Sequence, residues 1–286
     1  MHTFSEHNPI AVAAYFLCVS GVAMFSMEPV LLLLSLAGAM ALFLRMGGRG
    51  HGLALVLFVA AALVNPLVSH AGATVLFVVN DNPVTLEATL YGLAAAAMIV
   101  AVLYSFRTFQ ALMTSDRLLY LLGALSPRLA LVISMAMRYV PLFTHQWRRT
   151  RQAQQALGLW REEDLLRRAA SHLRVFSILL TWALENGVVT ADSMAARGYG
   201  CTRRTHFAIF RFTWRDAALT AASLLLAGLS LMCAARRDFA FYPAISAAPA
   251  DLPVFLGYAA CALLALLPHI IDGKEALRWR SLRSRI

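Results

Sequence analysis

Charged residues are sparse along this chain, and the stretches between them are long and apolar. Six stretches without Asp, Glu, Lys or Arg come close to or exceed the roughly 20 residues that a helix needs to cross a bilayer. They lie between Glu6 and Glu28, between Glu28 and Arg45, between Arg49 and Asp81, and over 88–106, 217–235 and 252–271. The pattern predicts an all-α polytopic membrane protein with about six transmembrane helices.

The arginines predict the orientation of these spans, because cytoplasmic loops carry an excess of Lys and Arg. Arg45 and Arg49 place the loop after the second span inside, so we expect the N-terminus inside as well. Residues 70–86 contain no Arg or Lys and suit an outer loop. With six spans, both termini are then expected to be cytoplasmic.

Two parts of the chain do not follow directly from this orientation: the segment 118–140, and the pair Arg236 and Arg237. If 118–140 crossed the membrane, the dense arginine block that follows it would lie outside, so we expect this segment at the cytoplasmic interface or re-entering. Arg236 and Arg237 are the exception to the excess of Lys and Arg in cytoplasmic loops, since they fall on the outer side.

These expectations give three regions: a four-helix membrane region over 1–117, a cytoplasmic or interfacial coupling-helix region over 118–213, and a two-helix membrane region with a basic cytoplasmic tail over 214–286.

The middle region predicts two long helices, from about Leu129 to Leu157 and from Asp164 to Arg197. The second has only one narrow polar stripe, so we expect it to lie along the membrane face or under other helices. Both end on a small residue, one variable residue and Gly: Ala156-Leu157-Gly158 and Ala196-Arg197-Gly198. Gly directly after a helix is a common C-cap, which is the simplest interpretation of each end alone. Two such ends in one basic insert favour a pair of tips that face a common partner.

Composition narrows the class of protein. Hydrophobic residues make up 60% of the 286 residues and charged residues 14%, which excludes a disordered chain, a coiled coil and a typical cytosolic enzyme. The net charge is +10, and half of the 24 arginines, 12, lie between Arg148 and Arg215. A basic balance can indicate nucleic acid, anionic lipid or an acidic protein. In this membrane context we exclude nucleic acid as a partner and keep the lipid bilayer and acidic protein surfaces.

Several strings resemble one family. They are NPLVSHAGATVLF at 65–77, DRLLYLLGALSPRLALVISMAMRYVP at 116–141, VFSILLTWALENGVVTADSMAARGYG at 175–200 and RRTHFAIFRF at 203–212. In these strings the sequence resembles the T component (EcfT) of energy-coupling factor transporters, which are ABC-type importers of vitamins and metal ions.

The resemblance implies a scaffold without a catalytic site, which links two cytoplasmic ABC-type ATPases to a membrane substrate-binding subunit, the S component. It implies that Ala196, Arg197 and Gly198 form one ATPase-docking motif. Ala156, Leu157 and Gly158 occupy the place of the other, where Leu157 stands in place of the Arg of many members. Docking there is expected through apolar packing or through Arg151 or Arg161.

Other features of the residues complete these expectations. Glu185 is a further candidate within the second helix, where it faces water or pairs with Arg174 or Arg138. Trp147, Trp160 and Trp182 indicate interfacial anchors. The sequence lacks GxxxxGK[ST], so we expect no cofactor on this chain and ATP use by the partner subunits.

Two other functions fit a basic, polytopic chain. One is the translocation subunit of a conventional ABC importer, which would carry a single coupling loop and a polar substrate path. The other is a membrane-embedded enzyme acting on a lipid or phosphate substrate through the Arg and His residues of the insert. It predicts activity in the isolated chain and little effect of ATPases.

Overall fold

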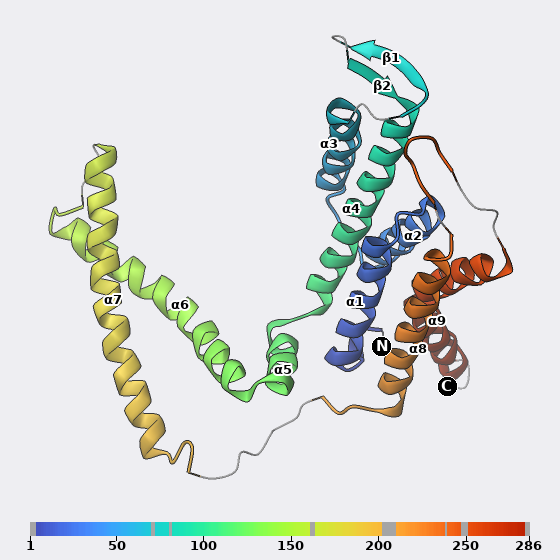
Figure 1. Cartoon of the computed structure of the whole chain (residues 1–286). Helices are drawn as coiled ribbons and strands as arrows, with labels where there is room; N and C mark the ends of the chain where they lie inside the picture. The colour runs from blue at the N-terminus through green and yellow to red at the C-terminus, as the bar shows by residue number, and fades with distance from the viewer. Residues whose placement is uncertain are drawn as a thin grey trace. The chain divides into compact units, whose positions relative to one another are not determined.

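The computed structural model describes residues 4–69, 72–79, 82–160, 164–201, 210–237, 239–246 and 251–283. A short 3₁₀ helix (Phe4–Glu6) precedes α1. The α-helices are α1 (Pro9–Phe25), α2 (Pro29–Arg45), α3 (Gly52–Val68), α4 (Leu86–Leu112), α5 (Ser115–Leu125), α6 (Pro127–Ala156), α7 (Leu165–Ala196), α8 (Trp214–Ala234) and α9 (Leu252–Arg283). Two strands, β1 (Val75–Val79) and β2 (Asn82–Thr85), form one antiparallel ribbon (Figure 1). The chain is an all-α polytopic membrane protein, as the sequence predicts.

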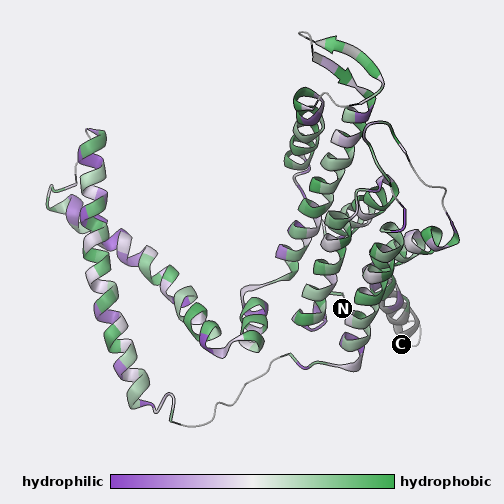
Figure 2. Cartoon of the chain, viewed as in Figure 1, coloured by the Kyte–Doolittle hydropathy of each residue, from purple (hydrophilic) through white to green (hydrophobic). Residues whose placement is uncertain are grey.

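A helix occupies each of the six predicted spans. Among the described residues, four helices are long and apolar enough to cross a membrane: α4, α7, α8 and the part of α9 over Leu252–Lys274. Each of α1, α2 and α3 has 17 residues, about 25 Å of helix. Their surfaces are predominantly hydrophobic, whereas α6 and α7 alternate hydrophobic and hydrophilic segments (Figure 2).

The chain divides into two compact units. Unit 1 contains residues 1–118 and 210–286, and unit 2 contains 119–209. In unit 1, α1 packs on α8, α8 on α9, and α4 on both α2 and α3. Its main core includes Tyr15, Phe16 and Leu264, with edge-to-face contacts among the aromatic rings. Helices from the two ends of the chain therefore form one membrane unit.

The contact between α3 and α4 depends on an unusual close approach. Pro66 lies inside α3 and has no N–H to donate toward the carbonyl of Ala62. Gly92 of α4 sits against that carbonyl, because a Cβ at Gly92 would lie 2.7 Å from the Ala62 oxygen. Asn65 strengthens the contact by donating through Nδ2 to the carbonyl of Ala88 at 2.7 Å.

The expected outer loop contains the β-ribbon, which the hydrophobic pattern does not predict. Val75, Phe77 and Val78 are β-branched or aromatic residues that favour a strand, and they pair with Thr85, Val84 and Pro83. The ribbon leads directly into α4, where the Thr85 hydroxyl accepts from the N–H of Ala88 as the N-cap.

Arg237, an exception to the loop-charge rule, has a buried partner. Its guanidinium donates to the carboxylate of Glu28, which lies in the turn between α1 and α2. The Tyr258 hydroxyl of α9 contacts both groups. The Glu28 side chain is 4% exposed and that of Arg237 is 17% exposed. The positive charge is therefore held in an ion pair rather than free in a loop.

Unit 2 contains α6, α7 and most of α5. The segment 118–140, expected to lie at the cytoplasmic interface or to re-enter, is divided between α5 and α6. The division falls at Ser126-Pro127, because Pro is favoured in the first turn of a helix and its ring excludes a preceding helical residue. Buried residues of α6 and α7 are few: Thr150, Ser171, Val175 and Leu179.

Candidate functional site

The ends of α6 and α7 have the same backbone geometry. At the α6 end, the N–H of Gly158 donates to the carbonyl of Gln155 at 3.0 Å and the N–H of Leu159 to that of Gln154 at 3.0 Å. These two bonds define a Schellman motif, with Gly158 in the left-handed region at φ +65°.

The α7 end repeats this geometry residue by residue. The N–H of Gly198 donates to the carbonyl of Ala195 at 2.9 Å, and that of Tyr199 to Met194 at 3.1 Å. Gly198 has φ +73°, and the preceding residue, Arg197, has φ −82° and ψ 5°, close to the −82° and 0° of Leu157. Leu157 and Arg197 therefore stand at equivalent positions of two matching tips.

The two tips present different side chains. Leu157 is 70% exposed at the first tip, and Leu159 beside it is 45% exposed. At the second tip Arg197 is exposed, and Tyr199 is 53% exposed. The first tip thus offers an apolar surface, and the second a cation beside an aromatic ring.

An aromatic cluster holds the first tip against α7. The ring of His172 stacks on Trp147 with centroids 5.8 Å apart and meets Trp160 edge-on at 4.8 Å. The guanidinium of Arg151 lies over the Trp160 ring at 4.7 Å. Arg151, a predicted supporting residue, therefore contacts the tip through Trp160. No motif in the sequence pointed to this role of His172.

Further along, α6 and α7 cross through a second set of contacts. The hydroxyls of Tyr139 and Thr190 are hydrogen-bonded at 2.8 Å, and the ring of Phe143 meets Trp182 edge-on at 5.7 Å. The three tryptophans expected as interfacial anchors thus pack within unit 2. These contacts fix the two tips relative to each other. His172, beside the first tip, lies 25 residues before Arg197 on α7, a rise of roughly 35–40 Å.

The other predicted supporting residues, Arg161 and Glu185, are not seen at either tip. Arg161 lies outside the described residues. Glu185 is exposed on α7, and Arg174, one of the partners considered for it, donates instead to the carbonyl of Leu159 at 3.4 Å. Within the described ranges, no group of three His, Cys, Asp or Glu residues is placed to hold a metal ion.

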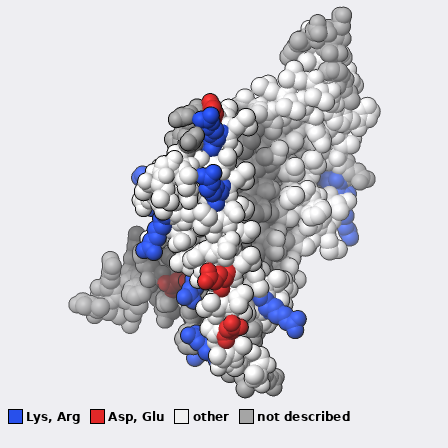
Figure 3. Space-filling view, turned by 90° about the vertical axis from the view of Figure 1, so that its left-hand side faces the viewer, with Lys and Arg blue, Asp and Glu red and all other residues white. Residues whose placement is uncertain are grey.

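Basic side chains are dispersed over the surface seen in Figure 3, and a few acidic ones lie among them. In α7 the exposed Arg167 pairs with Asp164 at 3.5 Å. The charge is therefore distributed along the helices, and the tip geometry, rather than one basic patch, distinguishes the candidate site.

Comparison with known proteins finds sequence similarity over about a third of this chain. No family model matches the sequence. The chain is 32% identical over 100 residues to the energy-coupling factor transporter transmembrane protein EcfT of Brevibacillus brevis, and 30% identical over 106 residues to that of Lactobacillus helveticus. The chain is EcfT-like. The two matches cover 34% and 36% of this chain, and it spans 38% of the length of each relative.

The EcfT relatives are transmembrane proteins of transporters by name, which fits the polytopic fold. The similarity supports an energy-coupling transmembrane protein.

Proposed function

We propose that this chain is the energy-coupling scaffold of an ECF-type ABC importer. It links two cytoplasmic ABC-type ATPases to a membrane S component that takes up a vitamin or a metal ion. The ATPases bind and hydrolyse ATP, and this chain itself is no enzyme. The observation that carries the proposal is the pair of matching Schellman tips on α6 and α7 in an EcfT-like chain.

The geometry of the tips supports one ATPase at each. A helix that stops at a left-handed glycine turns away at once, so its last side chain can enter a groove on a partner. Since the tips are roughly 35–40 Å apart along α7, they suit two separate grooves better than one continuous surface.

The side chains suggest how each tip binds. The guanidinium of Arg197 can form two parallel hydrogen bonds to a carboxylate in an ATPase groove, a geometry that Lys cannot reproduce. Leu157, with 70% of its surface exposed, fits an apolar groove instead. We propose that the same orientation holds both termini and both tips on the cytoplasmic side.

The exposed face of α7 supports a further membrane-level contact. Leu173, Phe176, Leu180 and Leu184 are between 53% and 67% exposed. Their helical spacing puts them on one side of α7, away from the face that contacts α6 through Trp182 and Thr190. A helix with an apolar stripe on its exposed side needs lipid or a partner, and we assign this stripe to the bilayer and the S component.

Co-purification tests the proposal. We expect the tagged chain to retain two ABC-type ATPase subunits when they are produced together. Arg197→Glu places a negative charge against the proposed carboxylate and should weaken ATPase binding at the second tip at least about tenfold, since charge-assisted contacts contribute roughly 1.5–3 kcal/mol. The variant should therefore retain the ATPase at the first tip and lose the one at the second.

Arg168→Glu is the matched control, because Arg168 is also exposed on α7 but lies 29 residues before Arg197, near the other end of the helix. It should leave ATPase binding at the second tip unchanged. Equal loss in both variants would show a general charge effect, and no retention by the unmodified chain would contradict the proposed function.

A further inference from the structure

The β-ribbon is fixed to the start of α4 by a buried carboxylate. Glu87 lies in the first turn of α4 and is 2% exposed. Its Oε1 accepts from the hydroxyl of Thr74 at 2.8 Å and from the N–H of Thr74 at 3.3 Å. The N–H of Leu86 donates in turn to the carbonyl of Thr74 at 3.0 Å. The base of the ribbon is therefore held to the helix by hydrogen bonds in both directions.

Gly72 makes this close packing possible. Its φ is +145°, and a Cβ there would lie 2.6 Å from Oε2 of Glu87 and 2.6 Å from the hydroxyl of Thr85. A larger residue would displace the carboxylate or the N-cap of α4, so the backbone approaches both groups only at a glycine.

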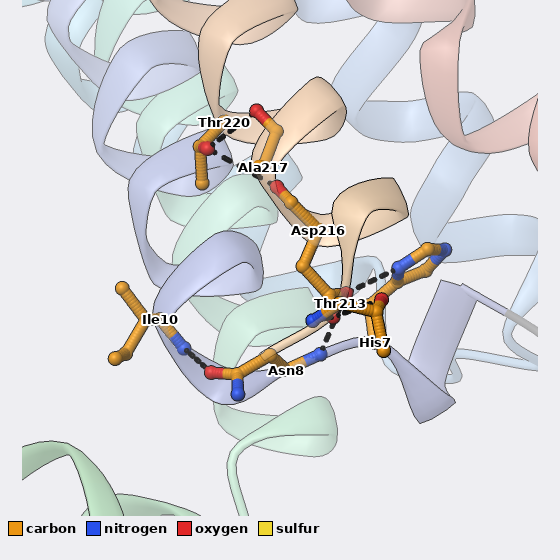
Figure 4. A network of polar contacts seen from close by, with 7 residues as sticks. All are labelled: His7, Asn8, Ile10, Thr213, Asp216, Ala217 and Thr220. Atoms are coloured by element: carbon orange, nitrogen blue, oxygen red, sulfur yellow. Dashed lines mark hydrogen bonds and ion pairs between the residues drawn. The ribbon is translucent and has the colours of Figure 1, made fainter. Parts of the chain in front are cut away.

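The same pairing of a threonine with a buried acid fixes the start of α8 (Figure 4). The N–H and hydroxyl of Thr213 both donate to Oδ2 of Asp216, at 2.9 and 2.7 Å. Oδ1 of Asp216 accepts from the backbone N–H of Asn8 at 3.1 Å and contacts Nδ1 of His7 at 2.8 Å. Since Asp216 is 3% exposed, both acids are bound inside unit 1 and neither adds an exposed charge to its surface.

The ribbon has one packed face and one open face. Val84 of β2 is 5% exposed, and β2 contacts both α3 and α4. On the open side, Val78 lies opposite Pro83 in the ladder and is 60% exposed. Leu76, where the pairing register shifts, is 53% exposed. An antiparallel ribbon with one face on a core normally presents polar side chains on the other, so these exposed side chains indicate an apolar partner.

The open face continues the lipid-facing surface of α3. The end of α3 exposes Val64, Leu67 and Val68 by 57%, 64% and 75%. Val68 is the last residue of α3, and β1 begins seven residues later at Val75. Both α3 and the ribbon carry hydrophobic residues in Figure 2. The apolar surface of the membrane unit thus extends past the end of the helix.

The chemistry of the ribbon fits the interfacial region of a bilayer. Residues 72–79 and 82–86 contain no Asp, Glu, Lys or Arg, so contact with lipid takes no charge of theirs out of water. In the described part of the chain the sheet has two strands, and each has one edge without a strand partner. The N–H and C=O groups of such edges need water or lipid headgroups, which excludes the hydrocarbon centre.

We propose that the open face of the ribbon, formed by Leu76 and Val78, contacts lipid in the interfacial region of the bilayer beside the end of α3. In the predicted orientation this is the outer leaflet. The proposal does not depend on the ATPases or on the S component, because it concerns the surface of this chain alone.

The purified full-length chain in phospholipid nanodiscs tests the contact. With the four native cysteines replaced by Ala, a nitroxide is attached to Leu76→Cys or to Val78→Cys. Oxygen concentrates in lipid and a water-soluble nickel chelate stays in water, so the ratio of their collision rates with the nitroxide reports its surroundings. Val64→Cys on α3 is the lipid reference, and the exposed Ser246→Cys is the water reference.

We expect both ribbon labels to give an oxygen-to-nickel ratio well above that of Ser246→Cys and close to that of Val64→Cys. A ratio equal to that of Ser246→Cys at both positions would overturn the contact. Low accessibility to both reagents would overturn it as well, because protein, such as a second copy of the chain, would then cover the face. Size-exclusion profiles confirm that each labelled chain folds.

Quenching by labelled lipids tests the depth of the ribbon. Bimane attached to Leu76→Cys should be quenched more strongly by phosphatidylcholine with a nitroxide near the headgroup than by phosphatidylcholine with a nitroxide near the end of the acyl chain. The reverse order, or no quenching by either lipid, would overturn the interfacial position.

Discussion

Glu28 and Arg237 are 209 positions apart in sequence, and their side chains form one buried ion pair that Tyr258 completes. Burying two charges is costly, and the cost is offset only while both partners are present. The pair holds the α1–α2 turn to the residues that follow α8. Arg237, which departs from the excess of Lys and Arg in cytoplasmic loops, thus forms a structural contact between the N-terminal and C-terminal parts of unit 1.

We expect variants of this ion pair to lower the free energy of unfolding. Glu28→Gln leaves the guanidinium of Arg237 without its carboxylate, so we expect it to destabilise the chain by roughly 3 kcal/mol. Arg237→Met should cost a similar amount. The double variant should cost clearly less than the two together, because no unpaired charge is left.

Unfolding of the purified chain in detergent measures these changes. Arg236→Met provides the control, since Arg236 is exposed directly beside Arg237. Strictly additive losses in the double variant would show that the two side chains are not coupled.

At the scale of elements, the two long helices of unit 2 could be predicted closely from the glycine that follows each of them and, for the second, from its polar stripe. The expected helix from Asp164 to Arg197 is α7, with Asp164 as its N-cap and Arg197 as its C-cap. The expected helix from Leu129 to Leu157 is α6, which begins two residues earlier at Pro127.

The left-handed conformation of Gly198 at the second tip predicts how substitutions there change the stability of α7. Gly198→Ala forces a Cβ into a left-handed conformation that costs roughly 1–2 kcal/mol, although open space surrounds the position. Gly187→Ala is the matched control within the same helix, because Gly187 also has open space but a helical backbone. It should stabilise the helix by about 0.5–1 kcal/mol.

Amide hydrogen exchange of Tyr199, whose N–H donates to Met194, reports on the cap directly. Exchange should accelerate in Gly198→Ala and not in Gly187→Ala. Equal exchange in both variants would show that the left-handed residue does not stabilise this end.

Other elements could not be predicted because their signals are tertiary. The β-ribbon follows an apolar stretch with no alternation, so the pattern there does not separate a strand from a loop or a span. The aromatic cluster around His172 joins residues from two helices, and single residues such as Trp147 and Trp160 fit a membrane interface equally well.

At the scale of the whole molecule, unit 1 joins helices from both ends of the chain, while unit 2 is inserted between them. The distribution of arginines predicts which ends of the helices face the cytoplasm. The Glu28–Arg237 pair is consistent with this, because both residues lie at helix ends that the predicted orientation places on the outer side.

Labelling of single cysteines tests the orientation. With the four native cysteines replaced, Met46→Cys should react with a membrane-impermeant maleimide only in inside-out vesicles. Ser246→Cys should react only in right-side-out vesicles. Both positions are exposed, so accessibility depends on the side of the membrane. Reaction of Met46→Cys in right-side-out vesicles would contradict the predicted topology.

The Glu28–Arg237 pair also gives membrane insertion an order in this orientation. Glu28 precedes Arg237 by 209 residues in the chain, so in the predicted orientation we expect its carboxylate to reach the outer side first. The carboxylate lowers the free-energy cost of burying the Arg237 guanidinium, because an ion pair replaces the hydration that the charge loses. We therefore expect the N-terminal hairpin to insert first and to offer Arg237 a partner when the last two spans insert.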